Sequence, residues 1–205
     1  FLWEANNRFG IRITTFNAGN LRNAIAREAD ALFSVAPDHK KDVESLARDF
    51  ESIFKAEYEI TEPDLKFSLN DAEKAAQCLS AQLQHQLLNA LYAGPHGVIA
   101  WSQSIPDFVE TSTNLAAIKF EGDKILITTS QRSSVSSAKE DIANMVAACF
   151  KRTSADVKHT GGYPGWTPNP ESPVVDLTAR KYRELFNEEP KVLAIHAGLE
   201  CGLIG

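Results

Sequence analysis

The residues whose types and spacing best suit chemistry lie near the end of the sequence. An apolar run at positions 192–195 is followed in quick succession by His196, Gly198, Glu200 and Cys201. A buried strand that ends in polar groups beside a glycine is a common way to present a site, because glycine lets a ligand or another backbone approach closely. The same pattern fits a strand followed by a tight turn, with His196 bonded to its neighbours and Cys201 packed as a small hydrophobe.

Several catalytic patterns are missing from the sequence. It has no Gly-x-Ser-x-Gly motif, and no cluster of glycines stands before a helix with a lysine that would hold a phosphate. A cysteine nucleophile at Cys201 activated by His196 is conceivable, although the two side chains need not face each other across a turn. The histidines are scattered, at positions 39, 85, 96, 159 and 196, so we expect no metal site and no cofactor in this chain.

Two isolated polar residues are further candidates. Asn23 follows the Gly19-Asn20 turn and precedes a predicted strand, where its amide could donate a hydrogen bond to an oxyanion or could instead cap its own turn. Arg132 ends a predicted strand among serines, where its guanidinium could hold a carboxylate or could be solvated at the sheet end. The sequence alone leaves both alternatives open.

The composition is typical of a soluble globular protein. The 205 residues are 43% hydrophobic and 23% charged, and the net charge of −6 argues against nucleic acid or an anionic membrane as a partner. No apolar run approaches the ~20 residues that a membrane-spanning helix needs. The three cysteines, Cys78, Cys149 and Cys201, are widely spaced, which favours a reducing cytoplasm over disulfide or zinc-binding roles.

The hydrophobic pattern predicts an α+β fold, with an antiparallel sheet and helices on one face. Residues 11–54 and 111–150 each fit strand, turn, strand and helix, which suggests a crude duplication. The pattern also predicts a long helix from Asn70 to Leu91, with Asn70 and Glu73 as its cap, and short strands at 58–60 and 156–163.

The segment after the predicted sheet has a different character. Residues 161–170 contain three glycines and three prolines, which predicts a linker over residues 161–171. Ser172 and Pro173 are typical of a helix start, and the helix and strand that follow predict that residues 172–205 begin a second domain. Neither end of the sequence matches the end of a complete fold, so we expect a piece of a longer protein.

Four segments of the chain carry a family resemblance. Residues 16–28 (FNAGNLRNAIARE), 109–114 (VETSTN), 162–166 (GYPGW) and 195–202 (IHAGLECG) resemble the aminoacyl-histidine dipeptidase (Xaa-His dipeptidase) branch of the M20 metallopeptidases. The resemblance covers essentially the whole chain, and the last segment is highly specific. It implies a two-metal catalytic domain that is interrupted by an inserted lid domain, which closes over a dipeptide substrate.

The resemblance also implies roles for particular residues. Residues 1–160 would be most of the lid, and residues 172–205 would return into the catalytic domain. Asn23 would match a lid asparagine that stabilises the tetrahedral intermediate, and Arg132 would match the lid arginine that holds the substrate's C-terminal carboxylate. Gly198 would match a backbone position that contacts substrate, with His196 and Glu200 as further contacts.

The ligands of the family's two divalent metal ions, which we expect to be zinc, have no counterpart in this sequence. We therefore expect a cytoplasmic metallo-dipeptidase of which this chain alone is inactive. Its partners would be a dipeptide and the missing catalytic segments. An alternative is a non-catalytic association module that forms a homodimer, because M20 relatives use a similar α+β layer for dimerisation. A free-standing hydrolase that uses Cys201 is a third hypothesis.

Overall fold

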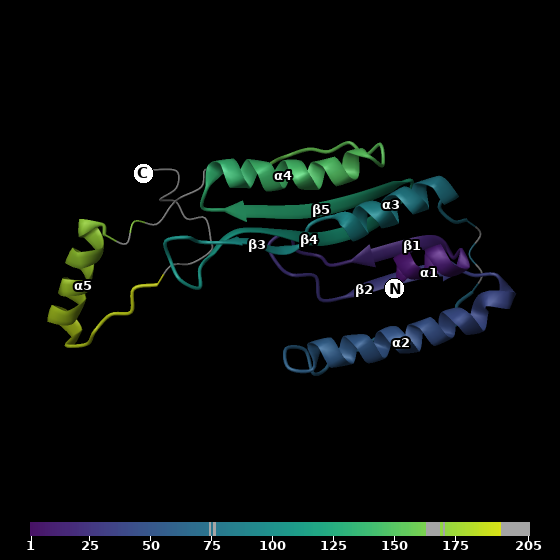
Figure 1. The fold of residues 1–205 in the computed structure, drawn as a ribbon, viewed down its shortest axis with the longest axis horizontal. Coiled ribbons are helices and arrows are strands. Elements are labelled where there is room, and N and C mark those ends of the chain that lie inside the picture. Colours follow the sequence, from purple (N-terminus) through teal and green to yellow (C-terminus); the bar gives the residue numbers. More distant parts are fainter. Residues whose placement is uncertain (74, 76, 163–168, 170, 194–205) are drawn as a thin grey trace. The chain divides into compact units, whose positions relative to one another are not determined.

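The computed structural model describes residues 1–73, 75, 77–162, 169 and 171–193. These residues form two compact units. Unit 1 contains the described residues of 1–94, 115–128 and 148–156, and unit 2 contains residues 95–114, 129–147 and the described residues from 157 onward. The helices (Figure 1) are α1 (Leu2–Phe9), α2 (Lys40–Tyr58), α3 (Ala81–Ala93), α4 (Ser136–Lys151) and α5 (Pro173–Phe186). The strands are β1 (Arg12–Ala18), β2 (Ala29–Ser34), β3 (Gly97–Trp101), β4 (Val109–Glu121) and β5 (Lys124–Ser133).

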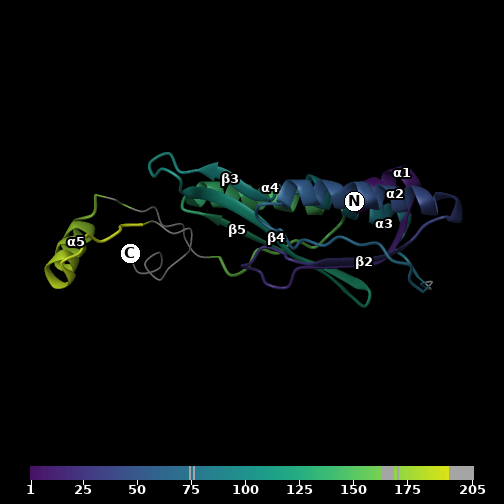
Figure 2. The same cartoon turned by 90° about the horizontal axis from the view of Figure 1, so that it is seen from below.

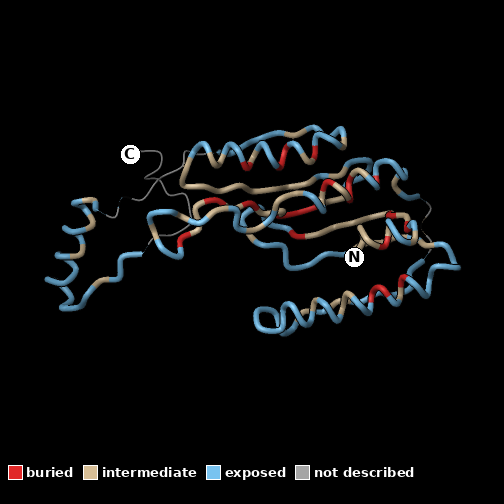
Figure 3. The backbone as a smooth tube through the Cα atoms, viewed as in Figure 1, coloured by how far each residue is buried: buried red, intermediate tan, exposed pale blue. Residues whose placement is uncertain are grey.

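The sheet of unit 1 is built on the antiparallel pair of β1 and β2. Its register runs from Arg12 opposite Ser34 to Ala18 opposite Ala29, and Ala18 also pairs with Ile118 of β4. Helices α1, α2 and α3 lie on the same side of β1 and β2 (Figure 2). The buried core of this unit consists of Ala5, Ile11, Ile13, Val43, Leu46 and Leu88, and Figure 3 colours the buried positions of the chain red.

One buried polar side chain joins three elements of unit 1. Gln84 of α3 is 1% exposed, and its Oε1 accepts a hydrogen bond of 2.7 Å from the backbone N–H of Ile13 in β1. Its Nε2 donates to Oδ1 of Asn6 at 2.6 Å and to the carbonyl oxygen of Ile11 at 2.7 Å. Because a buried amide is costly unless it is bonded, these contacts fix α3 against α1 and β1.

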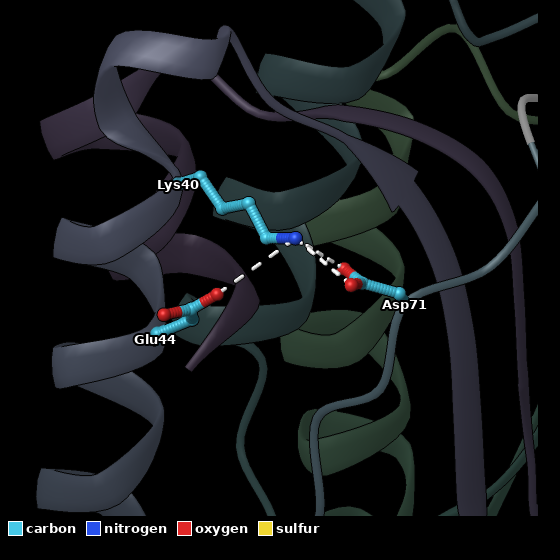
Figure 4. Close-up of polar contacts among 3 residues, drawn as sticks. All are labelled: Lys40, Glu44 and Asp71. Atoms are coloured by element: carbon cyan, nitrogen blue, oxygen red, sulfur yellow. Dashed lines mark hydrogen bonds and ion pairs between the residues drawn. The ribbon is translucent and has the colours of Figure 1, made fainter.

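The segment that leads from α2 to α3 is tethered at its surface. Nζ of Lys40 lies 2.7 Å from Oδ1 of Asp71 and 4.0 Å from Oε1 of Glu44 (Figure 4). The hydrogen bond that Lys40 donates to the carboxylate of Asp71 raises the pKa of Lys40 above its ordinary value. All three side chains are exposed, so this cluster orients the segment and adds little stability.

In unit 2, β3 pairs antiparallel with the first half of β4, from Gly97 opposite Thr113 to Trp101 opposite Val109. Strand β5 also pairs with β4. Two side-chain contacts fix that register: the hydroxyls of Thr111 and Ser133 are 2.9 Å apart, and Nε2 of Gln131 donates to Oγ1 of Thr113 at 3.0 Å.

The predicted α+β class and its antiparallel sheet are confirmed. The order β1, β2, α2 and the order β4, β5, α4 reproduce the expected repetition of strand, strand and helix. The expected hairpin between β4 and β5 is also present, and Gly122 in its turn adopts a φ of 61°. The predicted domain boundaries at 160 and 172 stay predictions.

Three predicted elements are wrong. The helix predicted from Asn70 begins only at Ala81, as α3. Oγ of Ser80 caps α3 by accepting a hydrogen bond from the N–H of Leu83, and the N–H of Leu79 donates to the carbonyl of Ile13 in β1 and not to a carbonyl within a helix. Residues 58–60 are not a strand, since α2 continues through Tyr58 and the side chain of Ile60 is 95% exposed. Residues 156–162 contain no strand either.

Strand β3 was not predicted from the sequence. Its pairing with β4, which the local sequence does not reveal, makes it a strand. Among the described residues, no helix combines the length and the apolar character that crossing a membrane would require.

Candidate functional site

Asn23 lies in unit 1, in the loop of residues 19–28 that joins β1 to β2. The last pair of the β1–β2 ladder is Ala18 opposite Ala29, and the next residue closes the loop by a hydrogen bond of 3.0 Å from the N–H of Gly19 to the carbonyl of Glu28. The two ends of this loop are therefore fixed to the sheet, and the residues between them project beyond the strands.

The Asn23 side chain is exposed within a turn of this loop. The N–H of Ala24 donates to the carbonyl of Leu21 at 3.2 Å, so Asn23 is the third residue of that turn. No hydrogen bond joins the Asn23 amide to another residue of loop 19–28, so the self-capping alternative is not observed. Leu21 and Ile25 on either side are 58% and 74% exposed. The loop thus presents an amide donor between two apolar side chains.

A shallow depression lies beside the neck of this loop. It is lined by Asn17, Ala18, Gly19, Glu28, Ala29, Asp30 and Lys119. Oδ1 of Asn17 accepts a hydrogen bond of 3.0 Å from the N–H of Phe120 in β4, which ties the end of β1 to its neighbour. Asn23 does not line this depression.

Arg132 lies in unit 2, one residue before the end of β5. Because Thr111 contacts Ser133 and Thr113 contacts Gln131, the antiparallel register places Arg132 opposite Ser112, on the other face of the sheet from those pairs. Thr111 and Thr113 are 2% and 3% exposed. Ser112 and Arg132 are half-buried, so the guanidinium lies on the more accessible face.

A guanidinium on a regular strand is well suited to bind a carboxylate. Its planar fork donates two parallel hydrogen bonds, and the pairing of β5 with β4 limits the movement of the backbone that carries it. The contacts around it are polar: the N–H of Ser134 donates to the carbonyl of Glu110 at 3.2 Å, and the N–H of Val135 donates to Oγ of Ser133 at 3.1 Å. These bonds hold the end of β5 and the turn into α4.

The remaining predicted site residues, His196, Gly198 and Glu200, and also Cys201, lie outside the described residues. Asn23 belongs to unit 1 and Arg132 belongs to unit 2. In the described part of the chain, no group of three or more His, Cys, Asp or Glu side chains is arranged to hold a metal ion.

Sequence reasoning missed Gly19 as a residue of the site. The turn at residues 17–20 was visible from its composition, and so was a glycine within it. What the sequence does not show is the neighbour of that glycine, because an added Cβ would meet the carbonyl oxygen of Ala116, which lies far away in the sequence.

Comparison with known proteins confirms the family resemblance. Residues 4–62 match the peptidase dimerisation domain of the M20 family. The chain is 36% identical, over 203 residues and 99% of its length, to the cytosol non-specific dipeptidase of Escherichia coli (strain K12), and it covers 42% of that relative. The crystal structure of the aminoacylhistidine dipeptidase from Vibrio alginolyticus matches with a TM-score of 0.91 and 29% identity, over 99% of this chain and 41% of that one.

The chain therefore spans less than half the length of these two relatives. Residues 4–62 are similar to the peptidase dimerisation domain of the M20 family, and the chain as a whole is similar to one part of each of these dipeptidases.

Proposed function

We propose that this chain is the substrate-closing part, or lid, of a cytoplasmic metal-dependent dipeptidase that hydrolyses Xaa-His-type dipeptides. The observation that carries the proposal is the similarity of 99% of the chain to two dipeptidases of more than twice its length. The chain would hold and orient the substrate, while the residues that bind the metal ions would lie on polypeptide beyond these 205 residues.

The described residues do not form a ligand set for a metal ion, so no step is assigned to a metal in this part of the protein. In the whole enzyme, two divalent ions, which we expect to be zinc, would polarise the scissile carbonyl and activate water. The work of this chain's own residues would be to place hydrogen-bond donors on the substrate and to exclude water.

Asn23 would donate its amide N–H to the oxyanion that develops on the scissile carbonyl. The geometry supports this role, because the side chain is exposed, makes no bond within its own loop, and projects from a loop whose ends are fixed. A donor that is held in place before the reaction stabilises negative charge without having to reorganise.

Arg132 would bind the C-terminal carboxylate of the dipeptide. Its place on a regular strand supports this role, since a cation at a fixed distance from the scissile bond measures the length of the substrate. A longer peptide would put its carboxylate beyond reach. Gly198, with His196 and Glu200, would contact the same substrate from residues outside the described part.

A chimaeric enzyme tests this proposal. These 205 residues would replace the aligned segment of the Escherichia coli relative, and the chimaera would be assayed with an Xaa-His dipeptide in the presence of zinc. We expect the chimaera to hydrolyse the dipeptide and the 205-residue chain alone to show no hydrolysis. A folded chimaera without activity, or cleavage by the chain alone, would contradict the proposal.

A second function, association of two copies, is favoured by the match of residues 4–62 to a dimerisation domain. Within unit 1, β2 pairs with β1 on one side, and none of the described strands pairs with its other edge, where a strand of another chain could add. We expect size exclusion with light scattering to give the mass of a dimer for the 205-residue chain at micromolar concentrations. A monomer at every concentration tested would remove this second function and leave the lid proposal intact.

A further inference from the structure

Gly19 occupies a position that only glycine can fill. Its φ of 58° lies in the left-handed region, and a Cβ added there would lie 2.0 Å from the carbonyl oxygen of Ala116. Real Cβ atoms do not approach other heavy atoms below about 3 Å. Ala116 is fully buried in β4, and its oxygen belongs to the backbone of a central strand, so it cannot move aside as a flexible side chain would.

The same glycine closes loop 19–28. Its N–H donates to the carbonyl of Glu28, and its added Cβ would also lie 3.0 Å from the Cβ of Ala26 on the returning arm of the loop. The outgoing arm, the returning arm and β4 therefore converge on Gly19. Next to it, Ala18 pairs with both Ala29 and Ile118, so the anchor of the loop is continuous with the sheet.

We propose that Gly19 is a positioning residue, which sets where loop 19–28 presents the amide of Asn23 to the substrate. This inference rests on the proposed function, in which that amide donates to the oxyanion. Gly19 itself touches no substrate. It acts because its lack of a side chain lets the loop rest directly on the backbone of β4, and any added atom must lift the loop from that strand.

Gly19→Ala in the chimaeric enzyme is expected to lower kcat about 10-fold or more, with a smaller change in KM. A misplacement of about 1 Å of a group that acts on the reacting atoms can cost ~10²-fold in rate. The clash with Ala116 requires a shift of about that size. If Gly19→Ala acts only by displacing Asn23, it cannot lower kcat more than Asn23→Ala does.

Two other glycines provide matched controls. Gly10 and Gly122 each have a φ of 61°, but an added Cβ would meet no atom within 4 Å at either place. Gly10→Ala and Gly122→Ala therefore impose the same backbone strain without displacing loop 19–28. We expect kcat close to that of the unmodified chimaera for both, even where thermal stability falls.

A double-mutant cycle distinguishes positioning from a general loss of structure. If Gly19 acts through Asn23, adding Gly19→Ala to Asn23→Ala lowers kcat no further, whereas an independent structural defect multiplies the two losses. An unchanged kcat for Gly19→Ala, or multiplied losses, would overturn the inference. If Asn23→Ala itself leaves kcat unchanged, the role of Asn23 in the proposed function fails, which is a distinct result.

A milder variant covers the case in which Gly19→Ala does not fold. Ala26→Val enlarges the side chain on the returning arm that faces Gly19 and leaves the glycine in place. We expect it to lower kcat and to add nothing to the loss caused by Asn23→Ala. Multiplied losses, or an unchanged kcat in a folded Ala26→Val enzyme, would overturn the inference in the same way.

Discussion

Asn23→Ala is expected to lower kcat of the chimaeric dipeptidase by ~10²–10³-fold, the cost of removing one donor from an oxyanion site. KM should change little, because the bond from the amide strengthens only as negative charge develops on the carbonyl oxygen. Steady-state kinetics with a saturating Xaa-His dipeptide measures this effect directly.

Two substitutions make this result specific. Asn20 is an exposed asparagine in the same loop, so Asn20→Ala should leave kcat near the unmodified value. Asn23→Asp keeps the size of the side chain but replaces its N–H donor by a carboxylate oxygen, and it should lower kcat at least as much as Asn23→Ala. A variant that loses stability but keeps its kcat would show that Asn23 serves the loop and not the reaction.

Arg132→Ala is expected to raise KM by roughly 10- to 100-fold. A hydrogen bond to a charged group contributes about 1.5–3 kcal/mol, and each 1.4 kcal/mol is about tenfold in binding. The substrate carboxylate is bound in the ground state as well as in the transition state, so kcat should fall much less than kcat/KM.

The control for Arg132 lies on the same strand. Lys124 begins β5, is exposed, and carries the same charge, so Lys124→Ala removes one cation without removing the proposed contact. Its KM should stay within about twofold of the unmodified value, since screened surface charges act weakly. Arg132→Lys should restore only part of the affinity, because an ammonium lacks the planar fork of the guanidinium. Equal effects of Arg132→Ala and Lys124→Ala would indicate a general electrostatic effect.

The sequence predicts the elements whose pattern is complete within a short window. The alternation at 29–35, the apolar spacing of Val43, Leu46 and Ala47, and the Gly122 turn each depend on neighbours a few residues away. The structure confirms these elements as β2, α2 and the β4–β5 hairpin. Local propensity and tertiary packing agree at these places.

The sequence fails where distant contacts decide the conformation. Residues 77–79 are drawn away from a helix by bonds to β1: the N–H of Leu79 donates to Ile13, and the hydroxyl of Thr14 donates to the carbonyl of Gln77. Strand β3 depends in the same way on its pairing with β4. No sequence pattern within residues 70–101 identifies β1 or β4 as the partner of these segments.

The residues of the candidate site also differ in how far the local sequence identifies them. Asn23 and Arg132 were candidates from their places in the sequence, which left a structural alternative open for each, and the family resemblance then implied their roles. The structure places both on accessible parts of their own units, and for Asn23 it shows no self-capping bond within its loop. The sequence did not identify Gly19 as a candidate functional residue, because the need for glycine there comes from its close contact with the carbonyl oxygen of Ala116 on another strand.

We propose above all that this chain binds the ends of a dipeptide, and a comparison of two substrates tests this proposal most directly. The kcat/KM of the chimaeric enzyme is measured for an Xaa-His dipeptide and for the same dipeptide with its C-terminal carboxylate converted to an amide. We predict that the dipeptide is preferred by at least about tenfold, the worth of a charge-assisted contact, and that Arg132→Ala abolishes this preference. A preference that is absent from the start, or that persists undiminished in Arg132→Ala, would contradict the account.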